Sequence, residues 1–280
     1  MSESMAGQTQ SETLQLAIHA AREGGKIVKN GFRNQLDVEV KKKDNSLVTN
    51  IDKQAESIIH KILRSGSPHG IIGEEGTRQS AENGTFWIID PIDGTTNFVR
   101  NIPLFCVSIA LIQHSRILVG VTYQPMTNAC YYAEAGKGAY LNGEKLTVSA
   151  AGQDGAGVIM LEHGRDPASK KRNAILFERL GETYTLRKFG TSALELCYVA
   201  AGLTDAFISS GDQLWDFAAG IVLVKEAGGI FTDWRGQEWS GDHAYILLSN
   251  GTIHNELVNQ TRDLQPEVIS ADDRRRFSYL

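Results

Sequence analysis

The stretch WIIDPIDGTTNF, residues 87–98, holds the pattern from which the fold and the chemistry of this chain can be predicted. Its apolar start belongs to the run FWII, residues 86–89, which is typical of a short buried strand. Pro91 has no N–H to donate, so we expect the strand ladder to stop there, directly after Asp90. A second carboxylate, Asp93, follows soon afterwards. The sequence therefore predicts two acids at the end of one buried strand.

The residues that follow favour a turn into a short helix. Gly94 suits the turn, and Thr95 or Thr96 can cap a helix that is entered near Asn97. The free amides of a helix start can bind a phosphate, and carboxylates are ligands for a hard cation such as Mg²⁺. The alternative is a tight Asp-Gly turn with a threonine cap and no ligand.

Another apolar segment also ends in acid. The run GIIG, residues 70–73, is followed by Glu74 and Glu75. Taken alone, this pattern indicates a strand that runs out into solvent. Beside the acids of residues 87–98, it indicates a further carboxylate for the same site.

A nearly all-apolar helix is predicted by DQLWDFAAGIVLVKEAGG, residues 212–229. Asp212 is expected to cap it, and the glycines at 228–229 are expected to end it. Since apolar residues cover most of its circumference, the helix should be buried. Asp216 lies in its first turn, where an ionised carboxylate is costly unless it is paired with charge or metal. The alternative is that Asp216 only favours the positive end of the helix dipole.

The wider chain divides into two patterns. Apolar residues at helical spacing predict helices over residues 12–31 and from Thr49, as N-cap, to Gly66. Strands joined by short turns predict an antiparallel sheet at residues 70–73, 86–89, 105–112, 117–124 and 129–136. Beyond residue 150, strand and helix candidates alternate, which is typical of an α/β arrangement. We therefore expect an α+β part over residues 1–150 with most of the acids, and an α/β part over residues 151–280 with Asp216.

Composition limits the function classes. The formal net charge of −5 disfavours nucleic-acid binding, which usually comes with a basic excess. The three cysteines are widely spaced without a C-x-x-C motif, which argues against a disulfide framework or a zinc site. The N-terminus lacks the features of a secretory signal, and the longest strongly apolar run, residues 217–224, is far below the ~18 residues of a membrane span. We expect a soluble cytoplasmic protein that does not contact membranes.

Together these motifs resemble the inositol monophosphatase family of Mg²⁺-dependent, lithium-sensitive phosphatases. The resemblance runs from the first helix to about residue 260, and the motifs agree in order and spacing. It is carried by GEEG (73–76), WIIDPIDGTTNF (87–98) and WDFAAGIVLVKEAGG (215–229), with weaker agreement at LVTNID (47–52) and GTSALELCYVAAG (190–202). It implies a layered αβαβα sandwich, usually assembled as a homodimer.

The resemblance also implies roles for individual residues. Two or three Mg²⁺ would be held by Glu74, Asp90, Asp93, Asp216 and the main-chain carbonyl of Ile92. Phosphate would be bound by the amides of Gly94 and Thr95, with Thr96 nearby. Asp52 and Thr95 would orient or deprotonate the attacking water, with Glu74 also placed in the catalytic set. Substrate contacts are implied for Gly190, Thr191, Ala193 and Asp216.

Two of these residues have other interpretations from the sequence alone. Asp52 with Thr49 forms a capping-box pattern, so its carboxylate could be purely structural. Cys106 lies within an apolar strand, which indicates a core residue and not a nucleophile. Among the histidines, only His163 is considered as a possible substrate contact.

One position departs from the family pattern and bears on the substrate. Family members that cleave inositol phosphates have a glutamate seven residues before the helix aspartate, where this chain has Ser209. A serine can still bond a polyol but lacks the charge-assisted bond of a carboxylate. The expected reaction is hydrolysis of myo-inositol 1-phosphate, with histidinol phosphate, fructose 1,6-bisphosphate, phosphoadenosine phosphate or another metabolite as alternative substrates. A binding protein that retains the fold is the alternative of another class.

Overall fold

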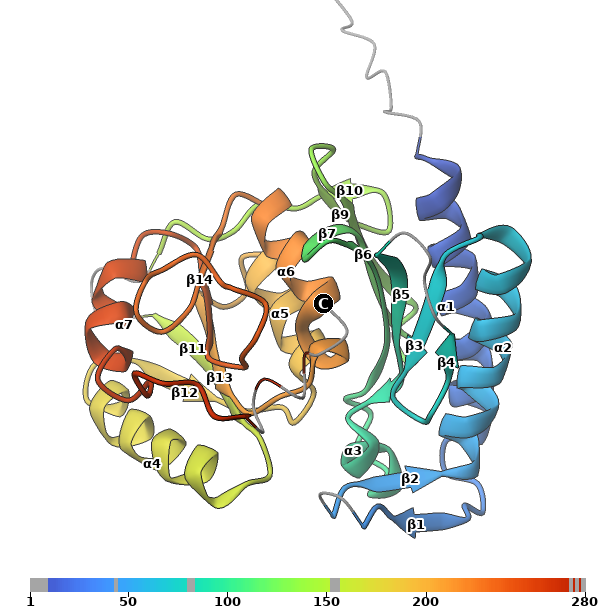
Figure 1. Ribbon diagram of the computed structural model, residues 1–280, viewed down its shortest axis with the longest axis horizontal. Helices are drawn as coiled ribbons and strands as arrows, with labels where there is room; N and C mark the ends of the chain where they lie inside the picture. The colour runs from blue at the N-terminus through green and yellow to red at the C-terminus, as the bar shows by residue number, and fades with distance from the viewer. Residues whose placement is uncertain are drawn as a thin grey trace, which may run out of the picture.

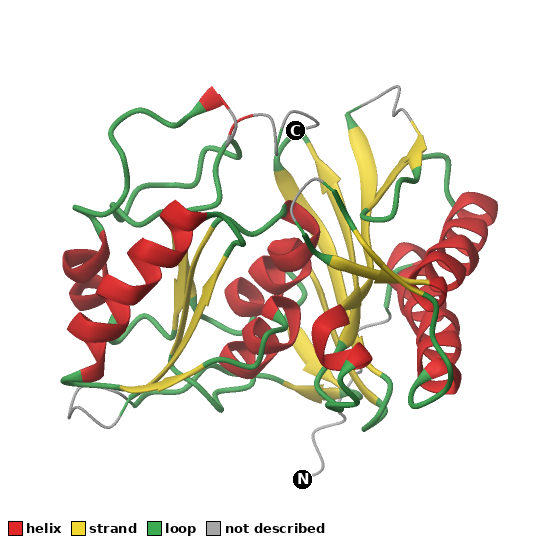
Figure 2. Ribbon diagram, turned by 90° about the horizontal axis from the view of Figure 1, so that it is seen from below, coloured by secondary structure: helices red, strands yellow, loops and turns green. Residues whose placement is uncertain are grey.

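The computed structural model describes residues 10–42, 45–79, 84–151, 157–271, 274 and 277. The first nine residues, on which the absence of a secretory signal partly depends, lie outside this part. Three layers of helices alternate with two β-sheets, as Figure 1 shows from one side and Figure 2 from below. The αβαβα sandwich expected from the sequence is confirmed.

The larger sheet has eight strands in the order β10-β9-β8-β7-β6-β5-β3-β4. Only β3 and β5 run parallel, while the other neighbours are antiparallel. The central strands are buried on both faces because helices cover each side. The strands are β3 (Gly70–Gly73), β4 (Arg78–Gln79), β5 (Thr85–Asp93), β6 (Cys106–Gln113), β7 (Arg116–Gln124), β8 (Ala129–Glu134), β9 (Ala139–Leu141) and β10 (Glu144–Lys145).

Two amphipathic helices cover the outer face of this sheet. Helix α1 (Glu12–Gly31) is capped by Ser11, and α2 (Asn50–Gly66) is capped by Thr49. Their buried faces pack on β5 to β8, so the predicted helices are confirmed. A small two-stranded sheet of β1 (Val38–Val40) and β2 (Leu47–Thr49) lies beside the start of α2.

The middle layer consists of two buried helices, α5 (Ser192–Ala200) and α6 (Leu214–Glu226). Helix α6 contacts β6, β7 and β8 of the larger sheet, and α5 contacts both α6 and the second sheet. One hydrophobic core therefore joins the two sheets through this layer. The predicted burial of the apolar helix that carries Asp216 is confirmed.

The second sheet has five strands in the order β12-β11-β13-β15-β14. Its strands are β11 (Val158–His163), β12 (Thr185–Arg187), β13 (Ala206–Ser210), β14 (Ile230–Thr232) and β15 (Ile246–Ser249). Helices α4 (Pro167–Gly181) and α7 (His254–Thr261) cover its outer face. Among the described residues, no helix combines the length and the apolar character that a membrane crossing requires.

Strand β5 differs from the prediction at its end. The strand continues through Pro91 to Asp93, so the expectation that the ladder stops at the proline is wrong. Asp90 pairs with Ser108 and Asp93 pairs with Cys106, with a register irregularity between them. Three residue steps on β5 thus span two on β6, and a bulge is a place where a strand tolerates a residue without an N–H.

The short helix α3 (Thr95–Val99) follows this strand directly. Its N-cap is Gly94, and no side chain caps it, so the prediction of a cap by Thr95 or Thr96 is wrong. Gly94 has a φ of 92°, in the left-handed region that favours glycine. The chain therefore turns at this glycine, and the helix begins immediately after it.

Candidate active site

Three carboxylates from two elements meet at the end of β5. Asp90 and Asp93 come from the strand, and Asp216 comes from the first turn of α6. Each offers one oxygen such that the three atoms lie within 4.8 Å of one another. Asp90 and Asp93 are buried and Asp216 is half-buried. The structure thus brings together three of the acids that the sequence singled out.

The bulge in β5 makes this meeting possible. In a regular strand, residues three apart point to opposite faces of the sheet. The extra residue between Asp90 and Asp93 changes that alternation. The carboxylate of Asp90 also accepts the N–H of Ile92 at 3.0 Å, which fixes the strand end around it.

Asp93 is anchored by residues from the second half of the chain. Its Oδ2 atom accepts the Thr191 hydroxyl and the Ala193 N–H, each at 2.7 Å. Burial raises the pKa of Asp93 to about 7, and these two hydrogen bonds oppose the rise. The Cys106 sulfur lies 3.9 Å from the same oxygen, and Cys106 is buried in β6, as expected for a core residue.

The turn at Gly94 lies against the same segment of the second half. A Cβ at this position would come within 3.0 Å of the Leu104 carbonyl oxygen and 3.2 Å of Thr191 Cβ. The backbone of Gly190 is also adjacent. This close approach, with the positive φ, requires glycine at position 94. Thr96, in the first turn of α3, is exposed.

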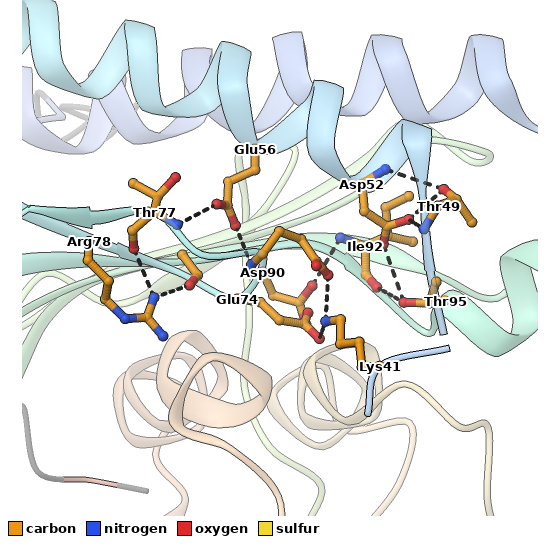
Figure 3. Close-up of polar contacts among 12 residues, drawn as sticks. Lys41, Thr49, Asp52, Glu56, Glu74, Thr77, Arg78, Asp90, Ile92 and Thr95 are labelled. Carbon is orange, nitrogen blue, oxygen red and sulfur yellow. Dashed lines mark hydrogen bonds and ion pairs between the residues drawn. The ribbon is translucent and has the colours of Figure 1, made fainter. Parts of the chain in front are cut away.

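A second group of polar residues lies beside the acids at the start of α2 (Figure 3). Asp52 Oδ2 accepts the backbone N–H of Thr49 at 2.8 Å and its hydroxyl at 2.5 Å, so the capping box predicted from the sequence is present. The other oxygen of Asp52 lies 3.4 Å from the Thr95 hydroxyl, which is 3.0 Å from the carbonyl oxygen of Ile92. Burial raises the pKa of Asp52 to about 6, against the hydrogen bonds from Thr49. Asp52 is therefore at once a helix cap and a neighbour of Thr95.

Glu74 lies beside Asp90 but is not part of the three-aspartate cluster, and its carboxylate is already paired with a lysine. Its carboxylate pairs with Lys41 Nζ at 2.8 Å, and the same ammonium pairs with Glu75 at 2.7 Å (Figure 3). Burial, followed by repulsion from Glu74, raises the pKa of Glu75 to about 7. Lys41 lies in the connection after β1, and its ammonium group offsets the negative charge of Glu74 and Glu75.

The electrostatics of the three aspartates favour a bound cation. Burial, followed by repulsion from Glu74 and Asp93, raises the pKa of Asp90 well above its usual range. Burial and the neighbouring aspartates likewise raise the pKa of Asp216 well above its usual range. Keeping these acids ionised at neutral pH therefore requires positive charge, and oxygen ligands of this kind suit a hard divalent cation.

The remaining sequence-predicted positions lie on the second half of the chain. Gly190 donates its N–H to Glu162 at 2.9 Å and to Glu195 at 3.2 Å. Ser209 is buried in β13 and donates its hydroxyl to Asp212 Oδ2 at 2.6 Å. His163 has its Nδ1 atom 2.8 Å from the carbonyl oxygen of Gly164.

The prediction that Asp212 caps α6 is wrong. The N-cap is Gln213, and its backbone N–H is accepted by Asp216 at 2.7 Å. Asp212 instead accepts the hydroxyls of Ser192 and Ser209. The carboxylate of Asp212 therefore lies directly beside Ser209, which stands where inositol-cleaving family members have a glutamate.

Sequence reasoning missed several polar residues around the site. Glu56 lies one helical turn after Asp52, and this spacing on one face of α2 was a usable signal. Lys41 stands in a run of lysines and carries no such signal. Glu162 pairs with Ser209 across neighbouring strands, which only the sheet topology reveals.

The chain is similar to known proteins over most of its length. The sequence matches the inositol monophosphatase family over residues 9–266. Nus factor SuhB of Escherichia coli (strain K12) is 40% identical over 253 residues, which cover 88% of this chain and 92% of that protein. A protein of Thermotoga maritima named fructose-1,6-bisphosphatase/inositol-1-monophosphatase is 34% identical over 261 residues, 92% of this chain and 98% of its own.

Solved structures show the same fold. The crystal structure of the extragenic suppressor protein suhB from Bartonella henselae is similar with a TM-score of 0.85 and 34% identity. The match covers 92% of this chain and all of that one. The resemblance seen in the motifs is thereby confirmed, and the chain belongs to the inositol monophosphatase family.

Proposed function

We propose that this protein is a Mg²⁺-dependent phosphatase that hydrolyses myo-inositol 1-phosphate to inositol and phosphate. The observation that carries the proposal is the convergence of Asp90, Asp93 and Asp216 within 4.8 Å, beside the Asp52–Thr95 pair. Membership of the inositol monophosphatase family supports the same chemistry.

The donor set fits Mg²⁺, which prefers carboxylate and carbonyl oxygens. Two or three ions would be held by Asp90, Asp93 and Asp216, with Glu74 and the Ile92 carbonyl as further ligands. Cations bound there supply charge neutralisation for a phosphoryl group and acidify water. Glu74 would exchange its ion pair with Lys41 for this role.

The neighbouring side chains would handle the water and the phosphate. The Thr95 hydroxyl can donate to the Ile92 carbonyl and still accept a hydrogen bond from the attacking water, while Asp52 lies close enough to take up the proton. The amides of Gly94 and Thr95 lie at the start of α3, where first-turn N–H groups lack acceptors within the helix. We assign phosphate binding to these two amides, with Thr96 at the edge of the phosphate site.

The residues from the second half would take two different parts. Thr191 and Ala193 both donate to Asp93, so they orient this carboxylate in addition to lining the substrate site. Asp212, which accepts the Ser209 hydroxyl, keeps a carboxylate beside the position where inositol-cleaving relatives have glutamate. This favours a substrate with several hydroxyl groups.

The alternatives differ in substrate or in class. Histidinol phosphate, fructose 1,6-bisphosphate and phosphoadenosine phosphate would undergo the same reaction at the same acids. The name of the Thermotoga maritima relative combines one of these alternatives, fructose-1,6-bisphosphatase, with inositol-1-monophosphatase. A second candidate function is a binding role with the fold retained, which the name Nus factor of relatives that are 40% identical keeps open.

The test is phosphate release from a panel of these four phosphate esters, with Mg²⁺ or with EDTA. We expect Mg²⁺-dependent release that is strongest for inositol 1-phosphate. Asp93→Asn should lower it by at least about 100-fold, because even partners behind the ligands are worth 10- to 100-fold in such sites.

The matched control is Asp233→Asn. Asp233 is also buried and accepts backbone N–H groups, from Arg235 at 2.9 Å and Gln237 at 2.8 Å, but it lies after β14. This variant should retain the activity. Release that persists in EDTA or in Asp93→Asn contradicts the proposal, and no release from any ester by a folded, Mg²⁺-binding protein favours the binding role.

A further inference from the structure

Glu56 has a buried carboxylate that the proposed chemistry does not use. It lies on α2, one turn after Asp52, and only 4% of its surface is exposed. A buried ionised acid is costly unless it is hydrogen-bonded. Its partners are therefore the first clue to its function.

Both oxygens of Glu56 accept backbone N–H groups from the turn that carries Glu74. Oε2 accepts from Glu75 at 2.7 Å, and Oε1 accepts from Thr77 at 3.0 Å. Figure 3 shows Glu56 above this turn, between α2 and the segment with Thr77. The carboxylate thus supplies acceptors for two amides of the β3–β4 connection.

The same turn is tied to β5 next to Asp90. Glu74 donates its N–H to the carbonyl oxygen of Ile89 at 3.1 Å, and Gly73 donates to Thr77 at 2.9 Å. A Cβ at Gly73 would lie 2.4 Å from the Glu56 carboxyl carbon, so the acid packs directly on the strand end. The position of Glu74 relative to Asp90 therefore depends on the backbone that Glu56 holds.

The arrangement requires a carboxylate. Two N–H donors converge on the two oxygens, whereas a glutamine would turn an NH₂ group toward one of them.

We propose that Glu56 is a positioning residue, which places Glu74 for cation binding by holding the turn from residue 74 to residue 77. The inference rests on the proposed function, since Glu74 serves as a ligand only if a divalent cation binds to these acids. Replacing Glu56 should therefore change the affinity for Mg²⁺ more than the turnover rate at saturating Mg²⁺.

The test compares Glu56→Gln with Glu226→Gln. Glu226 is a matched control because its carboxylate also accepts two backbone N–H groups, from Gly136 at 2.7 Å and Gly138 at 2.8 Å, in the turn after β8. Mg²⁺ binding is measured by isothermal titration calorimetry on metal-free protein, together with the half-saturating Mg²⁺ concentration for turnover.

We expect Glu56→Gln to weaken Mg²⁺ binding by about 10-fold or more, as for other residues that orient metal ligands. Turnover at saturating Mg²⁺ should remain near the wild-type rate, and Glu226→Gln should bind Mg²⁺ like the wild type. If Glu56→Gln does not fold, Glu56→Asp retains the charge but is too short to reach both amides, and it should also bind Mg²⁺ less tightly.

The outcomes separate the inference from the proposed function. Wild-type protein that does not bind Mg²⁺ contradicts the proposed function itself. Wild-type protein that binds Mg²⁺ while Glu56→Gln or Glu56→Asp binds it equally well contradicts only the role of Glu56. A loss of Mg²⁺ affinity of the same size in Glu226→Gln would show a general loss of stability and would also overturn the inference.

Discussion

The hydroxyl of Thr191 donates to Asp93 at 2.7 Å from a segment far along the chain. Thr191→Val replaces this donor with a methyl group of similar size, which leaves Asp93 with fewer bonds to orient it. We expect kcat/KM with Mg²⁺ to fall by about 10- to 100-fold, the usual cost of losing a partner behind a metal ligand. Steady-state kinetics on the best ester of the panel measures this.

Thr261→Val is the control for the lost hydroxyl. Thr261 is buried and donates to the Trp234 carbonyl oxygen at 2.8 Å, so the substitution removes a comparable bond in the outer helical layer. The variant should lose stability without losing activity. Equal kinetics for Thr191→Val and the wild type would contradict the orienting role of Thr191.

At the scale of single residues, the acids of the site could be predicted from the sequence, whereas their hydrogen-bond partners could not. Asp90, Asp93 and Asp216 could be singled out because each stands where an apolar element ends or begins. The role of Asp212 was misassigned, because aspartate is a preferred N-cap residue and glutamine is not, yet the N-cap of α6 is Gln213. The Asp212 carboxylate instead accepts the hydroxyls of Ser209, three residues earlier, and of Ser192, which comes from the start of α5. Such partners can be recognised only after the fold has brought them together.

Helix α7 is joined to the second sheet through its first residue. His254 Nδ1 lies 2.8 Å from the Ser249 hydroxyl and its Nε2 lies 2.9 Å from the Thr232 hydroxyl. Burial lowers the pKa of His254 to about 4. In the unfolded chain the same group titrates near its ordinary value of about 6.5.

The sign of the pH dependence follows from these two pKa values. Above about pH 6.5 the imidazole is neutral in both states, and the full stability is present. Between about pH 6.5 and pH 4 only the unfolded state gains the proton, so the His254 contribution to the free energy of unfolding falls by up to about 3 kcal/mol. Urea unfolding of wild type and His254→Gln at pH 7, 6 and 5 measures the difference.

The variant should show a flatter pH dependence than the wild type over this interval, because its side chain does not titrate. His19→Gln, which changes an exposed histidine of α1, should leave the wild-type slope intact. A His254→Gln protein with the same slope as the wild type would contradict the assignment.

Elements were predictable where local signals and burial agree. The helices α1 and α2 show helical spacing of apolar residues, and Thr49 marks the start of α2 in both sequence and structure. The end of β5 was not predictable, because Pro91 normally stops a ladder. Here it falls in a bulge, where no N–H is needed, and the strand resumes at Asp93.

The molecule as a whole holds buried acids that repel one another at the junction of its two sheets. Mg²⁺ bound by these acids should therefore stabilise the folded state, by about 2.7 kcal/mol when its concentration is 100 times Kd. Thermal unfolding of the metal-free protein with MgCl₂, and with NaCl at equal ionic strength, measures the shift. The melting temperature should rise with MgCl₂ only, and EDTA should reverse it.

Asp93→Asn should lose most of this stabilisation, since it removes one ligand and one repelling charge. An equal rise with MgCl₂ and NaCl would indicate general salt screening and contradict a specific site.

The division of the chain into two parts at residue 150 stays a prediction, because one hydrophobic core extends through the middle layer and joins both sheets. The homodimer implied by the resemblance also stays a prediction, which sedimentation analysis would test.

The bond between the Ala193 N–H and Asp93 joins residues that are one hundred positions apart. A chain made from its N-terminus forms β5 well before that donor leaves the ribosome. During this interval the aspartates of β5 are present, but α5 and α6, which cover the strand and complete the site, are not yet in place. The three-aspartate cluster is therefore complete only after α6 has been synthesised, and a nascent chain that stops before α6 lacks Asp216.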